Sequence, residues 1–166
     1  MEGKTALVTG GARRLGAAIV RRLHAAGASV LIHYRDSDAE AARLAAELNA
    51  ARAKSAVKVK AELLAPIPPR ALVSTALDAF GRLDLLVNNA SSFFPVEVGA
   101  IEASHWEELV GSNLRAPLFI CQEAAPELAI ACKPGGYHAR NAPMILASCL
   151  AQLPPEEAEP IIKSVE

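Results

Sequence analysis

Short apolar runs alternate with amphipathic segments along most of the chain. The run at 6–8 is continuously apolar and those at 29–34 and 83–87 are mostly so, as in strands buried on both faces of a sheet, whereas the run at 56–61 alternates valine with lysine. Between the runs, apolar residues recur every three or four positions, which predicts helices. We expect strands at residues 6–8, 29–34, 56–61 and 83–87, and helices at 16–26, 38–50, 70–80 and 104–128. This alternation predicts an α/β fold built on a doubly wound parallel sheet, in a single domain.

Local signals set the expected ends of the helices. Ser-x-x-Glu capping boxes at 37–40 and 104–107 are expected to open the second and the fourth helix, and Gly27 to end the first. The prolines within residues 66–69 predict a loop. Pro117 lies inside the fourth helical pattern and should bend that helix.

Composition excludes several classes of function. The chain has 166 residues, of which 52% are hydrophobic, and no apolar run of membrane-spanning length, so we expect one soluble, cytoplasmic domain and no membrane partner. A formal net charge of -1 without a basic run argues against nucleic acid as a partner. Cys121, Cys132 and Cys149 lack metal-ligand spacing, which favours reduced thiols and no metal site.

The first strand leads into a glycine turn that carries the strongest chemical signal. Residues 4–16 read KTALVTGGARRLG: an apolar strand, then small residues, then a helix start. In Rossmann-like folds this unit lets backbone N–H groups and the helix N-terminus meet a dinucleotide pyrophosphate. The spacing is T-G-x-x-x-R-x-G, with Arg14 where a middle glycine is common. The alternative is an ordinary strand-to-helix turn.

All four strands should end at one rim, because the carboxyl ends of parallel strands share an edge of the sheet. The second strand ends in His33-Tyr34-Arg35. Arg35 and Ser37 suit a 2′-phosphate, which favours NADP over NAD, whereas NAD-binding folds place an acid here. Asp36 counts against this prediction, and the alternative for Arg35 is a solvated surface residue.

Four motifs resemble the short-chain dehydrogenase/reductase family, and within it the pteridine reductases. They are TGGARRLG at 9–16, HYRDSDAEA at 33–41, LDLLVNNASSFFP at 83–95 and GSNLRAPLF at 111–119. The similarity covers about residues 4–128. The resemblance implies an NADPH-dependent oxidoreductase that transfers hydride to a pterin-like small molecule such as dihydrobiopterin or dihydrofolate. Two alternatives remain open: a reductase of another carbonyl substrate, and an NADP-binding remnant or sensor without catalysis.

The resemblance also implies roles for single residues. The NADP(H) contacts would be Gly10, Arg14, Leu15, Gly16, Tyr34, Arg35, Ser37, Glu62, Leu63, Asn89, Ala90 and Ser91. Ser91 and Phe93 would contact the substrate, with Phe93 stacked on a planar ring against the nicotinamide. Asn113 would kink the long helix and hold a water. Ser148, on a fifth strand at 142–149, would take the catalytic serine position.

The proton donor of the family has no counterpart in this chain. The family uses a Tyr with a Lys four residues later. The expected positions hold Ile161 and Val165, and no Y-x-x-x-K occurs anywhere in the sequence. We therefore expect a Rossmann-like domain at 1–150 that is truncated on its C-terminal side, followed by a divergent tail at 151–166. Homo-oligomers are usual for the family but doubtful here, since an open sheet edge would favour aggregation.

Overall fold

The computed structural model describes residues 1–65 and 68–131 and shows a four-stranded parallel sheet. Its strands are β1 (Thr5–Val8), β2 (Ser29–Tyr34), β3 (Ala56–Lys60) and β4 (Leu85–Val87), in the spatial order β3-β2-β1-β4. The chain runs outward from β1 to β3 and then returns to the far side of β1. The predicted doubly wound fold is confirmed, and its direction reverses between β1 and β4.

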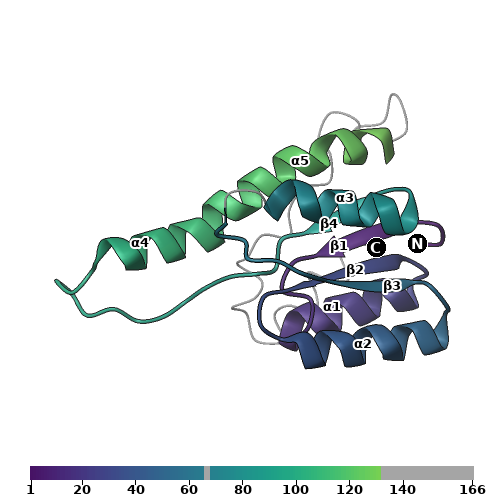
Figure 1. The fold of residues 1–166 in the computed structure, drawn as a ribbon, viewed down its shortest axis with the longest axis horizontal. Helices are drawn as coiled ribbons and strands as arrows, with labels where there is room; N and C mark the ends of the chain where they lie inside the picture. The colour runs from purple at the N-terminus through teal and green to yellow at the C-terminus, as the bar shows by residue number, and fades with distance from the viewer. Residues whose placement is uncertain (66–67, 132–166) are drawn as a thin grey trace.

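Helices cover both faces of the sheet (Figure 1). One face carries α1 (Arg14–Ala25) and α2 (Asp38–Ala51), and the other carries α3 (Pro68–Phe80) and α5 (Ala116–Ala131). A loop and α4 (Ala103–Val110) extend away from the sheet, and a π-helical turn, η1 (Gly111–Arg115), joins α4 to α5. The strand expected at 142–149, with Ser148, and the tail at 151–166 lie outside the described residues.

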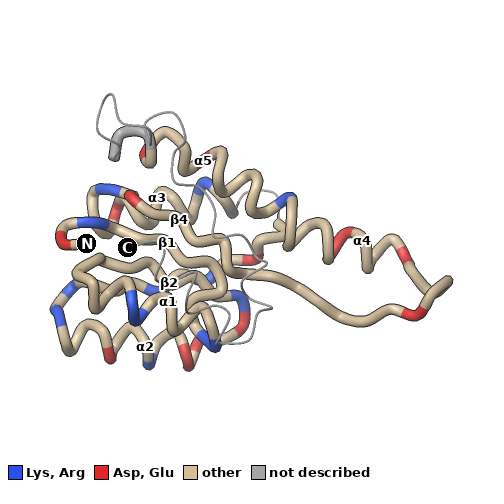
Figure 2. Tube along the Cα trace, turned by 180° about the vertical axis from the view of Figure 1, so that it is seen from behind, with Lys and Arg blue, Asp and Glu red and all other residues tan. Residues whose placement is uncertain are grey.

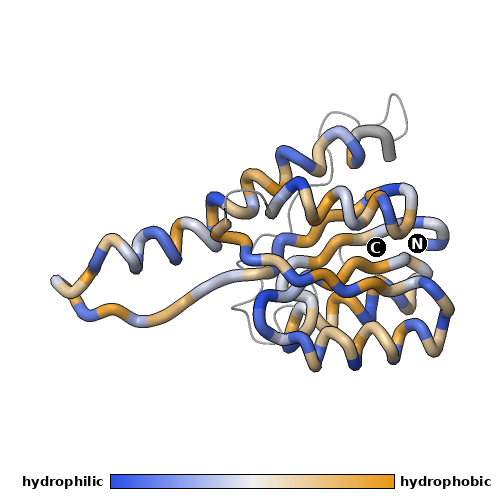
Figure 3. Tube along the Cα trace, in the orientation of Figure 1, coloured by the Kyte–Doolittle hydropathy of each residue, from blue (hydrophilic) through white to orange (hydrophobic). Residues whose placement is uncertain are grey.

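Two hydrophobic clusters form because alternate side chains of a strand point to opposite faces. Ala6 and Val8 pack with the α1/α2 layer, whereas Leu7, between them, packs with α3 and α5. Both faces of the sheet are covered, so the middle of each central strand is apolar (Figure 3). Loss of Leu7 or Leu31, each fully buried, would open a cavity beneath α3.

Several helix and strand ends differ from the prediction. The Ser37 side chain makes no cap hydrogen bond, and the motif that opens α4 starts earlier than expected, with Glu102 N–H donating to His105 Nδ1 at 3.0 Å. Pro68 opens α3 instead of belonging to a loop. A proline suits this place because the first N–H groups of a helix have no partner in any case.

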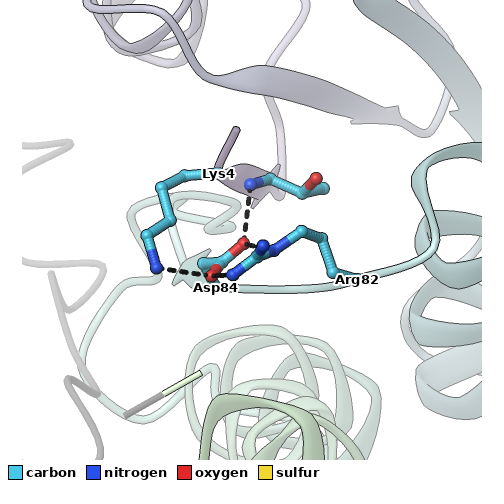
Figure 4. A network of polar contacts seen from close by, with 4 residues as sticks. Lys4, Arg82 and Asp84 are labelled. Atoms are coloured by element: carbon cyan, nitrogen blue, oxygen red, sulfur yellow. Dashed lines mark hydrogen bonds and ion pairs between the residues drawn. The ribbon is translucent and has the colours of Figure 1, made fainter. Parts of the chain in front are cut away.

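The fourth strand begins at Leu85, two residues later than predicted. The reason is that the Asp84 side chain, and not a backbone carbonyl, accepts the Thr5 N–H. Its carboxylate accepts the Thr5 N–H at 2.9 Å, Lys4 Nζ at 3.0 Å and Arg82 Nε at 2.7 Å (Figure 4). Burial by itself would raise the pKa of Asp84, but the hydrogen bonds from Arg82, the Thr5 N–H and Lys4 outweigh it and lower the pKa. Asp84 therefore ties the start of β4 to β1.

The long helix expected at 104–128 is interrupted, as Pro117 predicted. The interruption is the π-helical turn Gly111–Arg115 between α4 and α5. Pro117 cannot donate to the carbonyl of Asn113, four residues earlier, and its ring crowds that carbonyl, so a regular α-helix is costly there. The widened turn places Asn113 beside the loop that follows β4.

Charges of both signs are spread over the two layers (Figure 2). Blue and red positions follow each other along α2, and no single basic face appears in the described part of the chain. No helix among the described residues is both long and apolar enough to cross a bilayer.

Candidate functional site

A cavity of about 300 Å³ opens at the carboxyl ends of the strands, where the sheet reverses direction. It is lined by segments that follow β1, β2, β3 and β4. All twelve residues predicted to contact the cofactor line it: Gly10, Arg14, Leu15, Gly16, Tyr34, Arg35, Ser37, Glu62, Leu63, Asn89, Ala90 and Ser91. The fold therefore brings this predicted set together, and the roles of the single residues remain predictions.

The glycine turn after β1 needs its glycines for steric reasons. Gly10 has a φ of 62°, in the left-handed region. A Cβ on Gly16 would lie 2.2 Å from the Gly10 carbonyl oxygen and 2.7 Å from Asn89 Nδ2. Arg14 is also left-handed, with a φ of 49°, which costs about 1 kcal/mol or more for a residue with a Cβ. Strain of this kind is held where the surrounding contacts fix the backbone.

The N-terminus of α1 lines the cavity with backbone donors that have no acceptor among residues 1–65 and 68–131. The Gly10 and Gly11 N–H groups are already used, by His33 Nδ1 at 3.1 Å and the His33 carbonyl at 2.9 Å. The Ala17 N–H donates back to the Arg13 carbonyl at 3.2 Å. The N–H groups of residues 14–16 precede that bond, where a helix offers no internal acceptor. These amides and the positive end of the helix dipole suit a phosphate.

The turn after β1 and the loop after β4 are bonded into one unit. The Thr9 hydroxyl donates to the Val87 carbonyl at 3.3 Å and accepts the N–H groups of Asn89 and Ala90, each at 3.0 Å. Asn89 Nδ2 donates to the carbonyls of Thr9 and Gly10, at 2.9 and 3.1 Å. These hydrogen bonds therefore fix the turn after β1 and the loop after β4 to each other where they line the cavity.

Arg35 lines the cavity and has two acidic neighbours. Its Nε lies 2.9 Å from Asp36 Oδ2 and 4.0 Å from Glu62 Oε2, and its side chain is half exposed. Asp36 is thus turned toward Arg35, and both residues line the cavity with Ser37. Exposed ion pairs contribute only about 0–1 kcal/mol, so an incoming phosphate could displace Asp36 from Arg35.

Tyr34 is held as a neutral phenol. Its hydroxyl donates to Asp38, and Lys58 Nζ donates to the same carboxylate at 2.7 Å. The hydrogen bond to Asp38 raises the pKa of Tyr34, because the carboxylate favours the protonated phenol. Tyr34 therefore lines the cavity without the lowered pKa that a proton donor of this family needs.

Asn113 clamps the loop after β4. Its Oδ1 accepts the Ser92 N–H at 3.1 Å, and its Nδ2 donates to the Ser92 carbonyl at 2.8 Å. The Asn113 side chain thus holds the Ser92 backbone in place, and its predicted role in holding a water stays a prediction. Phe93, the next residue, is 78% exposed and does not belong to the described residues that line the cavity.

Sequence reasoning missed several residues that line the cavity. Arg13, His33, Ser92 and Ser112 are among them. His33 and Ser112 each adjoin a residue that was predicted, Tyr34 and Asn113, and that adjacency was the available signal. Ser148 lies outside the described residues.

Comparisons with known proteins match this fold and site. The family described as short chain dehydrogenase matches residues 4–136. Pteridine reductase 1 of Leishmania tarentolae is 37% identical over 155 residues, covering 75% of this chain and 54% of the relative. Hydroxynaphthalene reductase arp2 of Aspergillus fumigatus is 36% identical over 138 residues, covering 82% and 48%.

A solved structure is similar as well. It is that of a blue fluorescent protein from a metagenomic library in complex with NADPH. The identity is 37% and the TM-score 0.73, over 76% of this chain and 52% of that one. The chain spans about half the length of the curated relatives that it matches. The resemblance seen in the four motifs is confirmed, and the chain belongs to the short chain dehydrogenase family.

Proposed function

We propose that this chain carries the NADP(H)-binding part of an oxidoreductase that reduces a pterin-like substrate. The observation that carries the proposal is the cavity at the reversal point, into which the ends of all four strands bring a predicted cofactor contact. The donors present fit a dinucleotide: the backbone amides at the start of α1, which have no partner in the described part of the chain, for the pyrophosphate, and Arg35 with Ser37 for a 2′-phosphate. The NADPH-bound structural neighbour supports this choice.

The nicotinamide end is assigned to the loop after β4. Asn89, Ala90 and Ser91 line the cavity there, and Asn113 holds the next residue, Ser92, in place. When bound, the reduced cofactor supplies hydride. Phe93 would have to turn inward to stack on a planar substrate ring, and the pteridine reductase among the relatives supports that substrate class.

Titration of the protein with NADPH by isothermal calorimetry tests the cofactor assignment. We expect binding in the micromolar range, tighter than for NADH because the 2′-phosphate adds charge-assisted hydrogen bonds. Equal affinity for NADPH and NADH would contradict the 2′-phosphate site. Absence of binding by both nucleotides would contradict the proposed function.

Replacing Arg35 with alanine should lower the affinity for NADPH selectively. A charge-assisted contact contributes about 1.5–3 kcal/mol, so the dissociation constant for NADPH should rise about 10- to 100-fold. That for NADH should change less than about threefold, since its ribose carries no phosphate. Arg43→Ala, on the exposed side of α2, is the matched control. An equal loss for both nucleotides would place Arg35 away from the 2′-phosphate.

A second candidate is a module that binds the cofactor without turnover, favoured by the lack of any Y-x-x-x-K in the sequence. NADPH oxidation measured with dihydrobiopterin, and separately with a simple ketone, distinguishes the candidates. Oxidation with the pterin that Phe93→Ala abolishes supports the first proposal. Oxidation with the ketone, insensitive to Phe93→Ala, supports another carbonyl substrate. Binding without oxidation supports the module.

A further inference from the structure

His33 joins the ends of three neighbouring strands. It is the penultimate residue of β2 and is 2% exposed. Its Nδ1 lies 3.1 Å from the Gly10 amide nitrogen, in the turn after β1, and its Nε2 lies 3.1 Å from the Ala61 carbonyl oxygen, just beyond β3. Its own carbonyl accepts the Gly11 N–H at 2.9 Å. One residue therefore accepts the N–H groups of both Gly10 and Gly11.

The two partners of the imidazole determine which nitrogen carries the proton. The Gly10 N–H can only donate, so Nδ1 must present a lone pair. The Ala61 carbonyl can only accept, so Nε2 must carry a hydrogen. The neutral ring in this tautomer satisfies both contacts. The protonated ring carries hydrogens on both nitrogens and would set an N–H against the Gly10 N–H.

Displacement of Gly10 cannot stay local. The Gly10 carbonyl lies so close to Gly16 that a Cβ there would approach within 2.2 Å, and it also accepts a hydrogen bond from Asn89. A shift of Gly10 therefore moves the first turn of α1, whose amides face the cavity. His33 acts on a bound phosphate through this backbone.

We propose that neutral His33 is a positioning residue for the cofactor, and that its protonation loosens the glycine turn and weakens binding of the dinucleotide phosphates. This inference rests on the proposed cofactor site. It makes cofactor binding sensitive to acid through His33, a residue that is not one of the twelve predicted cofactor contacts.

Burial and the charges around His33 determine the pH range in which the ring takes up its proton. Burial lowers the pKa of His33, while its bond to the Ala61 carbonyl and the nearby Glu62 carboxylate act in the opposite direction. Arg14, Arg35 and Asp36 line the same cavity on the turn and on the segment after β2. Because the pKa is lowered, the neutral ring persists in the fold below the ordinary value near 6.5. The unfolded chain then binds the proton first, so stability also falls as pH drops below 6.5.

The test is calorimetric titration with NADP⁺ and NAD⁺ between pH 5 and pH 8.5, with circular dichroism at each pH to confirm folding. NAD⁺ is needed because a 2′-phosphate titrates near pH 6 by itself. We expect the affinity of the wild-type protein for both nucleotides to fall about tenfold on the acid side. His24→Gln, which alters a buried histidine bonded to Ser55 elsewhere in the fold, should keep this profile.

Variants at position 33 separate positioning from simple packing. His33→Ala should weaken binding about tenfold at pH 8. His33→Asn restores an acceptor at the position of Nδ1, and should recover part of that loss without the acid-side fall for NAD⁺. Identical NAD⁺ profiles for wild type and His33→Asn would overturn the inference. Absence of binding at pH 8 would overturn the proposed function together with it.

A spectroscopic measurement at pH 8 tests the tautomer of His33 even if the protein unfolds at acid pH. Long-range ¹⁵N–¹H spectra at pH 8 should show Nδ1 of His33 without a proton and Nε2 with one. The opposite tautomer, or a protonated ring, would overturn the inference.

Discussion

Replacing Gly16 with alanine should abolish measurable cofactor binding and lower the free energy of unfolding by about 3 kcal/mol. The added Cβ would lie 2.2 Å from the Gly10 carbonyl oxygen, far inside contact distance, and 2.7 Å from Asn89 Nδ2. The Gly10 carbonyl belongs to the backbone of a braced turn and cannot rotate away as a side chain could. The start of α1 must move instead, and the amides that face the phosphates move with it.

Urea denaturation and NADPH calorimetry measure the two effects. Gly81→Ala is the control: Gly81 has a φ of 74°, but a Cβ there meets nothing within 4 Å. It should cost about 1 kcal/mol through backbone strain alone and leave binding intact. Wild-type affinity in Gly16→Ala would show that the turn can yield, and would remove the steric argument for the site.

Replacing Asp84 with alanine should destabilise the fold by about 2–3 kcal/mol. The Asp84 side chain is 5% exposed, and its loss leaves the Thr5 N–H, Lys4 and Arg82 without their shared acceptor. Denaturant unfolding measures the change, with Asp78→Ala, an exposed carboxylate on α3, as the control within about 0.5 kcal/mol of wild type. A loss below 1 kcal/mol would show that solvent replaces Asp84 readily.

The contribution of Asp84 should also depend on pH. Its pKa in the fold is lowered, so its stabilisation is fully present above the ordinary carboxyl pKa of about 4 and is lost as pH falls through the lowered value. The difference in unfolding free energy between wild type and Asp84→Ala should therefore shrink as pH falls below about 4. A difference that stays constant would contradict this assignment.

The elements that could be predicted from sequence are those with one dominant signal. The bounds of β2 agree with the expected 29–34, because a buried strand between a glycine stop and a polar rim has sharp ends. Other ends depended on contacts that periodicity does not encode. The Asp84 carboxylate replaces a ladder bond and delays β4, and Pro117 widens a turn of the long helix.

The candidate site was predictable for a topological reason. Parallel strands bring their carboxyl ends to one rim, so residues scattered from Gly10 to Ser91 could be expected to line one cavity. The unpredicted features all depend on side-chain direction. Arg35 turns to Asp36, the Asn113 amide binds the Ser92 backbone, and Phe93 faces solvent. Local pattern carries no information about such choices.

The cross-bracing of the glycine turn by Thr9, Asn89 and His33 has a thermodynamic consequence. The conformational entropy of that loop is already lost when the chain folds, so a ligand that docks there does not have to freeze it. A larger share of the favourable contact energy between ligand and turn then appears as binding affinity. By the same reasoning, a substitution that loosens the turn should appear in calorimetry mainly as a larger entropic penalty on binding.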